Sequence, residues 1–275
     1  YLDATAGQGH AVSMFSDNDR AILYDETGYK KDIVINGTPT SPAYGSDPVI
    51  TFDNGSGGAV SGADEVGVYA NTNTTNHNYF SASDETAMDV GTGDFTIAGW
   101  FYCPVTCHGS SNTNRISIRK GIYTARYILI LESDSPYIFL NDLSTSQQVN
   151  GTSVLKDDKW HHICATVDRG GNVVVYVDGV AETTTACTVS GTLDNNDAFL
   201  VNTNGAGVYY GSGVKDLRLY KSALSSTDVL SLATNVFGSV GSPTVQYKFS
   251  EAASDTTIPN SGSGSSALSL QTGSG

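Results

Sequence analysis

The sequence has few basic residues: 14 Lys and Arg stand against 28 Asp and Glu, so the formal net charge is −14. Binding to the phosphate backbone of a nucleic acid depends on clustered Lys and Arg, and we therefore expect no nucleic acid partner. Long apolar runs are also missing, since the longest one, residues 127–131, has the length of a strand and not of a membrane span. No charged and apolar leader opens the sequence at Tyr1, and we expect a processed piece of a longer protein without membrane insertion.

Cysteine is too scarce for a disulfide scaffold, because only Cys103, Cys107, Cys164 and Cys187 occur in 275 residues. Cys103 and Cys107 form one local pair and the other two stand alone, which leaves the disulfide state of all four open. A structural zinc site uses closely spaced Cys or His pairs, and His108 beside Cys107 matches that pattern only weakly. The sequence patterns of serine hydrolases, phosphate-binding loops and zinc peptidases are absent as well.

The sequence does contain a regular alternation of apolar and polar residues, which is typical of β-strands. In residues 95–102 both faces are bulky, which predicts a central strand packed between two layers. Residues 160–168 and 172–177 predict two further strands, and Asp178-Gly179 predicts a two-residue hairpin turn before a returning strand at 180–185. Many short strands that follow one another closely predict an antiparallel β-sandwich or jelly roll.

Only one segment predicts a helix. Ser225 and Asp228 have the spacing of a capping box, with Asp in the position usually held by Glu or Gln. Residues 229–232 supply an apolar stripe, and the helix should run for about two turns to Asn235. The predicted fold is therefore almost entirely β, with one short helix near the C-terminus.

Four segments, in the expected order, resemble strands of the laminin-G-like, concanavalin A-like jelly-roll superfamily, of the kind found in phage and bacterial surface proteins. They are residues 91–100 (GTGDFTIAGW), 159–167 (KWHHICATV), 175–179 (VYVDG) and 214–220 (VKDLRLY), the last followed by Ala-Leu-Ser at 223–225. The resemblance covers residues 79–235 and implies an all-β antiparallel sandwich with one short C-terminal helix. This superfamily contains lectins, adhesion domains, glycosidases and viral surface proteins, so the resemblance specifies the fold far more narrowly than the function.

The resemblance divides the chain into an N-terminal segment with an opening strand (1–46), the jelly roll (47–237) and a C-terminal extension (238–275). The family's opening strand has a W-x-F-D-E…D-S-S-G pattern, and residues 14–28 could take its place. Residues 247–262 repeat the pattern after the helix. We expect the extension to dock on this sheet or on that of a neighbouring subunit, and the sequence leaves that choice open.

A glycoside hydrolase is a remote alternative that the superfamily brings with it. Retaining hydrolysis requires two carboxyl groups about 5–5.5 Å apart, and the glucanases of this superfamily carry them as E-x-D-x-x-E or E-x-D-x-E on one strand. The nearest sequence here, Glu132-Ser-Asp134, lacks the second Glu and is followed by Pro136. We therefore expect no enzymatic activity and no catalytic residues.

Calcium is the metal that the resemblance suggests, in a structural role. Related jelly rolls hold Ca²⁺ with an Asp of the strand that corresponds to 214–220 and a carboxylate near the opening strand. Asp216 matches the first position, and Asp17 or Glu251 matches the second, depending on which end completes the sheet. Carboxylate oxygens suit Ca²⁺, and the alternative is that Asp216 pairs with Lys215 or Arg218.

Glycan binding requires exposed aromatic rings next to polar side chains. Trp100 and Trp160 lie within predicted strands and are expected in the core. The better candidates lie in loops, and they are Tyr123, Asn202, Asn204, Tyr209 and Tyr210. The alternative is that these tyrosines pack over the ends of the sheets.

These features predict a non-catalytic, surface-exposed recognition or adhesion module that binds a glycan or a cell-surface receptor. The alternative is a structural subunit of a virion, such as a decoration or fibre protein, or of an extracellular filament, assembled by self-association through its termini. Both functions imply an extracellular location or a virion surface. Ligand identity and oligomeric state stay open at this point.

Overall fold

The computed structural model divides into two compact units, Tyr1–Pro48 and Val49–Gly275. In the first unit, β1 (Val12–Asp17), β2 (Arg20–Asp25) and β3 (Ile33–Asn36) form a three-stranded antiparallel sheet. Besides these strands, the structure describes residues 51–52, 69–71, 77–103, 108–109, 114–121, 126–132, 134–157, 159–203, 210–211, 213–234, 239–249 and 257–273.

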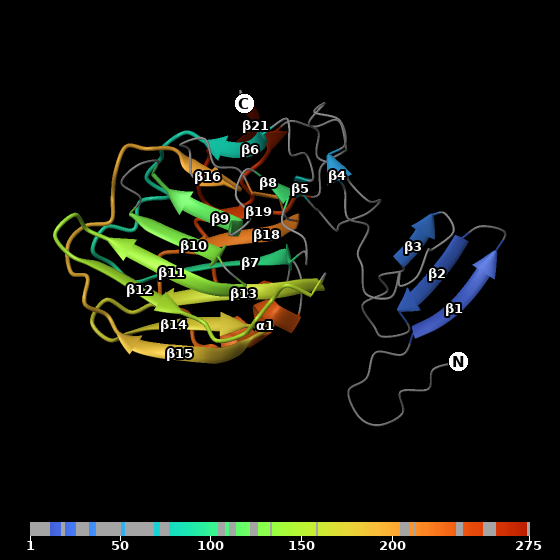
Figure 1. Cartoon of the computed structure of the whole chain (residues 1–275), viewed down its shortest axis with the longest axis horizontal. Coiled ribbons are helices and arrows are strands. Elements are labelled where there is room, and N and C mark those ends of the chain that lie inside the picture. Colours follow the sequence, from blue (N-terminus) through green and yellow to red (C-terminus); the bar gives the residue numbers. More distant parts are fainter. Residues whose placement is uncertain are drawn as a thin grey trace. The chain divides into compact units, whose positions relative to one another are not determined.

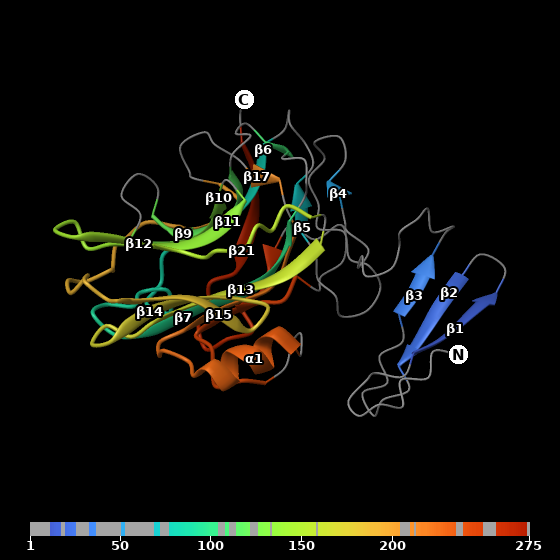
Figure 2. The same cartoon turned by 60° about the horizontal axis from the view of Figure 1, so that its bottom comes forward.

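The second unit is a sandwich of two sheets that lie face to face (Figures 1 and 2). Sheet I has the strand order β15-β14-β13-β7-β18-β5-β4, with β19 also beside β18, and sheet II has the order β12-β11-β10-β9-β16-β6-β21-β20. The neighbours are antiparallel except for the parallel pair of β4 and β5, and a small ribbon joins β8 to β17. The strands of sheet I are β4 (Thr51–Phe52), β5 (Tyr69–Asn71), β7 (Phe95–Cys103), β13 (Lys159–Val167), β14 (Asn172–Val177), β15 (Val180–Ala186), β18 (Gly213–Tyr220) and β19 (Val245–Tyr247); those of sheet II are β6 (His77–Ala82), β9 (Asn114–Lys120), β10 (Tyr127–Glu132), β11 (Ser135–Asn141), β12 (Ser146–Asn150), β16 (Phe199–Val201), β20 (Thr257–Ile258) and β21 (Leu268–Gly273); the ribbon consists of β8 (His108–Gly109) and β17 (Tyr210–Gly211).

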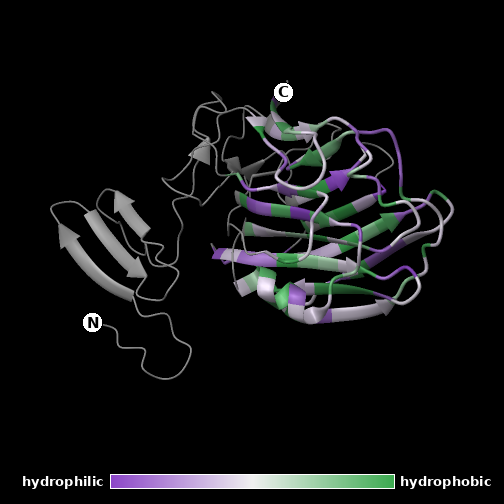
Figure 3. Cartoon of the chain, turned by 180° about the vertical axis from the view of Figure 1, so that it is seen from behind, coloured by the Kyte–Doolittle hydropathy of each residue, from purple (hydrophilic) through white to green (hydrophobic). Residues whose placement is uncertain are grey.

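Alternation along the strands builds one core between the two sheets, and hydrophobic residues alternate with more polar ones along many of them (Figure 3). In β7, Phe95, Ile97 and Phe101 are fully buried, and in β11 burial alternates at every position, with Ile138 and Leu140 in the core. Each fully buried side chain of this size contributes about 1.5–3 kcal/mol to stability. The antiparallel sandwich predicted from the sequence is thus confirmed.

Helix α1 (Ser226–Thr234) lies against the side of sheet I that faces away from the core (Figure 2). It begins with the predicted capping box: the Ser225 hydroxyl accepts a hydrogen bond from the Asp228 amide at 3.2 Å, and the Asp228 carboxylate accepts one from the Ser225 amide at 3.3 Å. Val229 and Leu232 are buried in a second apolar cluster that includes Tyr220. Within the described residues α1 is the single helix, as predicted.

A turn and a bulge in sheet I contain residues with positive φ. Asp178 and Gly179 have φ of 50° and 81°, as a type I′ hairpin between β14 and β15 requires, so the predicted hairpin is confirmed. In β18 the register shifts between Lys215 and Arg218, and Asp216 has a φ of 48°. This bulge turns Asp216 out of the regular alternation of its strand.

The C-terminal extension pairs within its own chain and contributes to both sheets. β19 pairs with β18 of sheet I, and β21 pairs with β6 of sheet II. Ile258 and Leu268 are fully buried, and the Glu85 carboxylate accepts hydrogen bonds at 3.0 Å from the amides of Ser265 and Ser266. Of the two segments that resemble the family's opening strand, the C-terminal one therefore adds strands to the sandwich, whereas residues 14–28 belong to the first unit.

Candidate functional site

The side of sheet II that faces away from the core carries aromatic rings and amides in register. Tyr137 and Phe139 of β11 are half-buried on this side, because the residues between them are in the core. On the neighbouring strand β12, the exposed Asn150 lies opposite Tyr137 and the exposed Gln148 lies opposite Phe139. We call this surface the open face, which consists of Arg119, Arg126, Ile128, Tyr137, Phe139, Gln148 and Asn150.

The same row of residues continues across the sheet to β9. Phe139 lies opposite Ile128 of β10, and Ile128 lies opposite Arg119 of β9. Tyr127 is fully buried and faces the core, so its neighbours Arg126 and Ile128 point to the outward side. The half-buried Arg126 and the buried Arg119 therefore lie at the border of the aromatic part of the open face.

Polar residues of β9 and of the position directly after β16 are buried nearby. Ser117 and Asn202 are both fully buried, and the backbone N–H of Asn202 donates to the backbone carbonyl of Ser117 at 2.7 Å. The Ser117 hydroxyl oxygen is buried and has no hydrogen-bond partner within the part of the chain that the structure describes. Strand β17, which contains Tyr210, also lies beside β9. The structure thus places two of the residues predicted from the sequence, Asn202 and Tyr210, in segments that lie beside β9.

The remaining residues predicted for glycan binding lie outside the described residues. Asn204 and Tyr209 belong to the segment between β16 and β17, and Tyr123 belongs to the segment between Gly121 and Arg126. Their role in binding stays a prediction.

The outward side of sheet I is occupied by the chain's own residues. Next to the part covered by α1, the Lys215 ammonium lies 4.7 Å from the ring centroid of Trp160 and 5.5 Å from that of Trp100, which is the geometry of a cation–π contact. His162 packs edge-on against Trp100, and burial lowers the pKa of His162 to about 4, so its ring is neutral at pH 7. The two tryptophans, expected in the core, are half-buried on the outward side of the sheet instead.

Asp216 forms a buried ion pair on the same side of the molecule. Its carboxylate accepts hydrogen bonds from the Arg218 guanidinium at 2.6 and 2.9 Å and from the Gln246 amide nitrogen at 2.8 Å. Both carboxylate oxygens are engaged, so a cation would have to compete with Arg218. Of the other predicted calcium ligands, Asp17 lies in β1 of the first unit and Glu251 lies outside the described residues.

No group of three or more His, Cys, Asp or Glu residues that could hold a metal ion occurs among the residues that the structure describes. Arg218 and Gln246 donate hydrogen bonds to Asp216, and these nitrogen donors do not supply the oxygen ligands that suit Ca²⁺. The structural calcium ion stays a prediction from the family resemblance.

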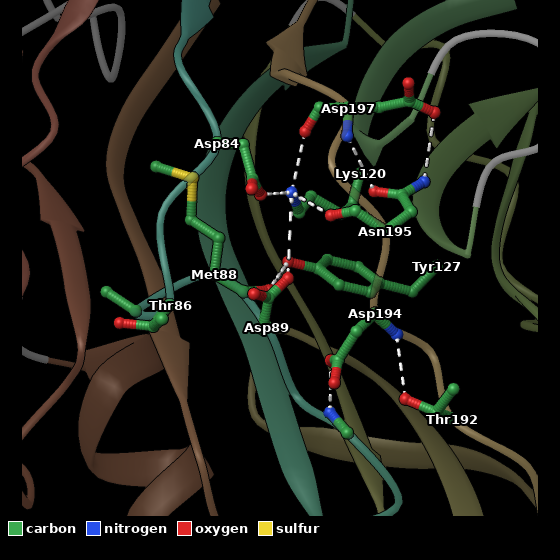
Figure 4. A network of polar contacts seen from close by, with 12 residues as sticks. Asp84, Thr86, Met88, Asp89, Lys120, Tyr127, Thr192, Asp194, Asn195 and Asp197 are labelled. Carbon is green, nitrogen blue, oxygen red and sulfur yellow. Dashed lines mark hydrogen bonds and ion pairs between the residues drawn. The ribbon is translucent and has the colours of Figure 1, made fainter.

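A buried ammonium is enclosed by oxygen atoms between β9 and the segments 84–89 and 195–197 (Figure 4). Lys120 is fully buried, pairs with the Asp84 carboxylate, and donates to the carbonyl oxygens of Asn195 at 3.0 Å and Asp197 at 2.6 Å. Asp89 lies 3.7 Å from the ammonium, and burial raises the pKa of Asp89, an effect that the ammonium offsets only in part. We call these five residues the Lys120 cage, which ties two loops to the end of β9.

Tyr137 and Phe139 are not among the residues predicted from loop composition, although one signal points to them. In residues 135–141 (SPYIFLN), Ile138 and Leu140 take the core positions, which leaves the two aromatic residues on the outward side. No comparable signal identifies the amides of β12 or Arg126, because their positions depend on strand register.

Two antiparallel sheets packed face to face, with a helix on one and an open aromatic and amide-bearing face on the other, define a jelly-roll β-sandwich of the lectin type. Residues 73–230 match the concanavalin A-like lectin/glucanases superfamily, and the chain belongs to this family. No curated protein matches the chain.

Several solved structures are similar to this chain at low sequence identity. A candidate carbohydrate-binding protein from Bacteroides ovatus has a TM-score of 0.57 and 16% identity, and the match covers 76% of this chain and 59% of that chain. The binding domain of Paraclostridial Mosquitocidal Protein 1 has a TM-score of 0.47 and 11% identity over 82% of this chain and 51% of that chain. A heptameric SAP-like pentraxin from Limulus polyphemus has a TM-score of 0.45 and 14% identity, and the match covers 62% of this chain and 84% of that chain. At these identities the similarity concerns the fold.

Among the described residues, no helix combines the length and the apolar character that crossing a membrane would require.

Proposed function

We propose that this protein is a non-catalytic glycan-binding module and that its glycan lies along the open face. One observation carries the proposal: the half-buried rings of Tyr137 and Phe139 lie in register with the exposed amides of Asn150 and Gln148, on a side of the sandwich that does not face the core. Sugars have apolar C–H faces that stack on aromatic rings and hydroxyl groups that bond to amides. This combination of side chains therefore suits a saccharide.

The rest of the sandwich supports the choice of this face. On the opposite side of the molecule, α1 covers part of sheet I, and Lys215 engages the rings of Trp100 and Trp160. The Bacteroides ovatus protein with a similar fold is described as a candidate carbohydrate-binding protein, and its matched part is 59% of its length. A glycan ligand on the open face agrees with that description.

Binding without hydrolysis is proposed because the segment nearest to a glucanase pattern, residues 132–136, lacks the second Glu, and its Asp134 is paired with a basic side chain. Asp134 forms an ion pair with Lys156, and the next two residues, Ser135 and Pro136, open strand β11. A module of this kind would act at a cell or virion surface. Self-association through the termini, as in a structural subunit of a virion or filament, stays the alternative.

A glycan array followed by isothermal titration calorimetry on the full chain tests the proposal. Phe139→Ala and Tyr137→Ala should each weaken binding about five- to tenfold, since a stacked ring contributes about 1 kcal/mol or slightly more. Leu230→Ala is the control, because it removes a 48% exposed apolar side chain from α1 on the other side of the sandwich and should leave the affinity unchanged.

Three results would overturn the proposal. The first is that no glycan on the array binds, and the second is that both ring variants bind as well as the unaltered chain. The third concerns the absence of catalysis: release of reducing sugar from the bound glycan would show that the protein is a hydrolase. Far-UV circular dichroism of each variant verifies that the sandwich is intact.

A further inference from the structure

Arg126 immediately precedes β10 and continues the backbone hydrogen bonds of sheet II. Its amide donates to the Lys120 carbonyl at 2.9 Å, and its carbonyl accepts from the Asn141 amide at 2.9 Å. The next residue, Tyr127, faces the core, so alternation directs the Arg126 side chain to the open face. The side chain is half-buried there.

Within the described residues, the Arg126 guanidinium has no acidic partner. Its Nε atom is buried and makes no hydrogen bond in this part of the chain. Lys120 pairs with Asp84 and Arg218 pairs with Asp216, whereas Arg169, in the turn between β13 and β14, also has a buried Nε atom without a hydrogen bond in the described part of the chain. A chain with 28 acidic and 14 basic residues does not lack carboxylates for such a pair. Because an unpaired buried donor costs about 1–3 kcal/mol, a missing ligand is a physical reason for this arrangement.

A second guanidinium lies on the same face. Arg119 is opposite Ile128 in the register of β9 and β10, and Arg126 precedes Ile128 by two residues, so the two arginines are diagonal neighbours. The Nε atom of Arg119 donates to the Gly121 carbonyl at 2.7 Å, which holds this guanidinium close to the end of β9. Ile128 and Phe139 follow on the other side. Positive charge therefore borders the aromatic part of the open face.

We infer that the glycan of the proposed function is acidic and that its anionic group binds to Arg126 beside Arg119. A guanidinium forms two parallel hydrogen bonds with a carboxylate or a sulfate, and it matches either oxyanion in shape and charge. A neutral hydroxyl accepts one hydrogen bond but leaves the positive charge uncompensated. The net charge of −14 repels a polyanion at long range, so the ligand is an oligosaccharide with an isolated acidic residue and not a polyanionic chain.

The experiment uses an array in matched pairs, in which each sialylated, uronate-containing or sulfated oligosaccharide stands beside the neutral counterpart that lacks only the acidic group. The unaltered chain should bind the acidic member about tenfold more tightly, as measured by calorimetry. Arg126→Gln should reduce this preference to about twofold or less, because it removes the charged fork. Arg126→Lys, which keeps the charge but loses the planar fork, should have an intermediate preference.

Arg169→Gln is the matched control. It removes the same charge from the turn between β13 and β14, where one terminal nitrogen donates to the Gly191 carbonyl at 2.5 Å and Nε has no hydrogen-bond partner among the described residues. Because this turn belongs to sheet I and not to the open face, the variant should keep the preference for acidic glycans. The carboxylate and sulfate arms of the array identify the oxyanion.

Each failure has a distinct meaning. Equal binding of acidic and neutral members would overturn the inference and leave the proposed function intact, whereas absence of all glycan binding would overturn both. A preference that survives in Arg126→Gln would overturn the assignment to Arg126. Tightest binding to a polysulfated chain would overturn the expectation of a single acidic residue.

Discussion

Replacement of Lys120 by Met should destabilise the fold more than the loss of a surface ion pair would. Met keeps most of the aliphatic chain but removes the ammonium from Asp84 and Asp89, and it leaves the carbonyls of Asn195 and Asp197 without their donor. Removal of one partner from a buried ion pair costs about 3–5 kcal/mol. Since the Asp84 and Asp89 side chains are 30% and 24% exposed, water relieves part of this penalty, and we expect a loss of about 3 kcal/mol.

Urea and thermal unfolding of the full chain measure this loss. In a domain of this size 1 kcal/mol corresponds to about 2–4 °C, so the melting temperature should fall by about 6–12 °C. The loss should shrink between about pH 7 and pH 4. Without the ammonium, which lowers the pKa of Asp89, burial holds the folded pKa of Asp89 still further above its unfolded value, so the variant regains stability as Asp89 becomes protonated. Burial already raises the pKa of Asp89 in the unaltered protein.

A surface pair and a double variant provide the controls. Lys156, which pairs with Asp134, has a 44% exposed side chain, and Lys156→Met should cost less than about 1 kcal/mol. Addition of Asp89→Asn to Lys120→Met should recover about 1 kcal/mol, because one uncompensated carboxylate is removed. The reasoning is refuted if Lys120→Met costs less than about 1 kcal/mol, or if its cost is the same at both pH values.

Three further changes test other parts of the structure. His161→Gln should lower the free energy of unfolding more at about pH 5.5 than at about pH 8.5. The hydrogen bond to Asp178 raises the pKa of His161, so the stabilisation is complete below the unfolded pKa of about 6.5 and is lost as the pH rises through the folded pKa. Urea unfolding at both pH values checks it, and equal losses would contradict it. Leu268→Ala should cost about 2–5 kcal/mol because this residue of β21 is fully buried, whereas Leu143→Ala, at a 61% exposed position, should cost less than about 0.5 kcal/mol; equal melting temperatures would show that the extension is not part of the core. Ser225→Ala should cost about 1 kcal/mol through loss of the N-cap of α1, and a melting temperature equal to that of the unaltered chain would argue against the capping box.

The elements that the sequence predicts correctly have signals that act within a few residues. Residues 95–102, 160–168 and 172–177 alternate with the period of a strand, and each lies in one strand of sheet I. The turn at 178–179 contains Asp and Gly, which adopt positive φ more readily than other residues. A capping box likewise needs only four consecutive residues. Such signals identify strands, turns and a helix without knowledge of how the sheets pair.

The candidate site depends on contacts between distant segments, and local patterns do not contain that information. Phe139 meets Gln148 only when β11 and β12 pair in one particular register, and Arg119 joins them only through β10. Asn202 was recognised as a polar loop residue, but its burial beside Ser117 follows from the position of β16 next to β9. The residues of the open face therefore could not be assembled from the sequence alone.

Lys120 shows the same limitation for a charged residue. By its register it takes a core position beside Tyr127 and Phe199, where composition alone would favour an apolar side chain. The groups that make this position tolerable are Asp84, 36 residues earlier, and the carbonyls of Asn195 and Asp197, 75 and 77 residues later. Only the fold brings them together.

The two outward sides of the sandwich differ in a way that stability alone does not explain. On sheet I, α1 buries Tyr220, Arg218 binds Asp216, and Lys215 lies over the two half-buried indole rings. On sheet II, Phe139 remains partly exposed and Arg126 has no acidic partner among the described residues, although polar or apolar replacements at either position would serve a strand equally well. An exposed ring and an unpaired guanidinium both lower the stability of the free protein. A bound ligand removes both costs at once, and this is the reason to search for the function of the protein on sheet II.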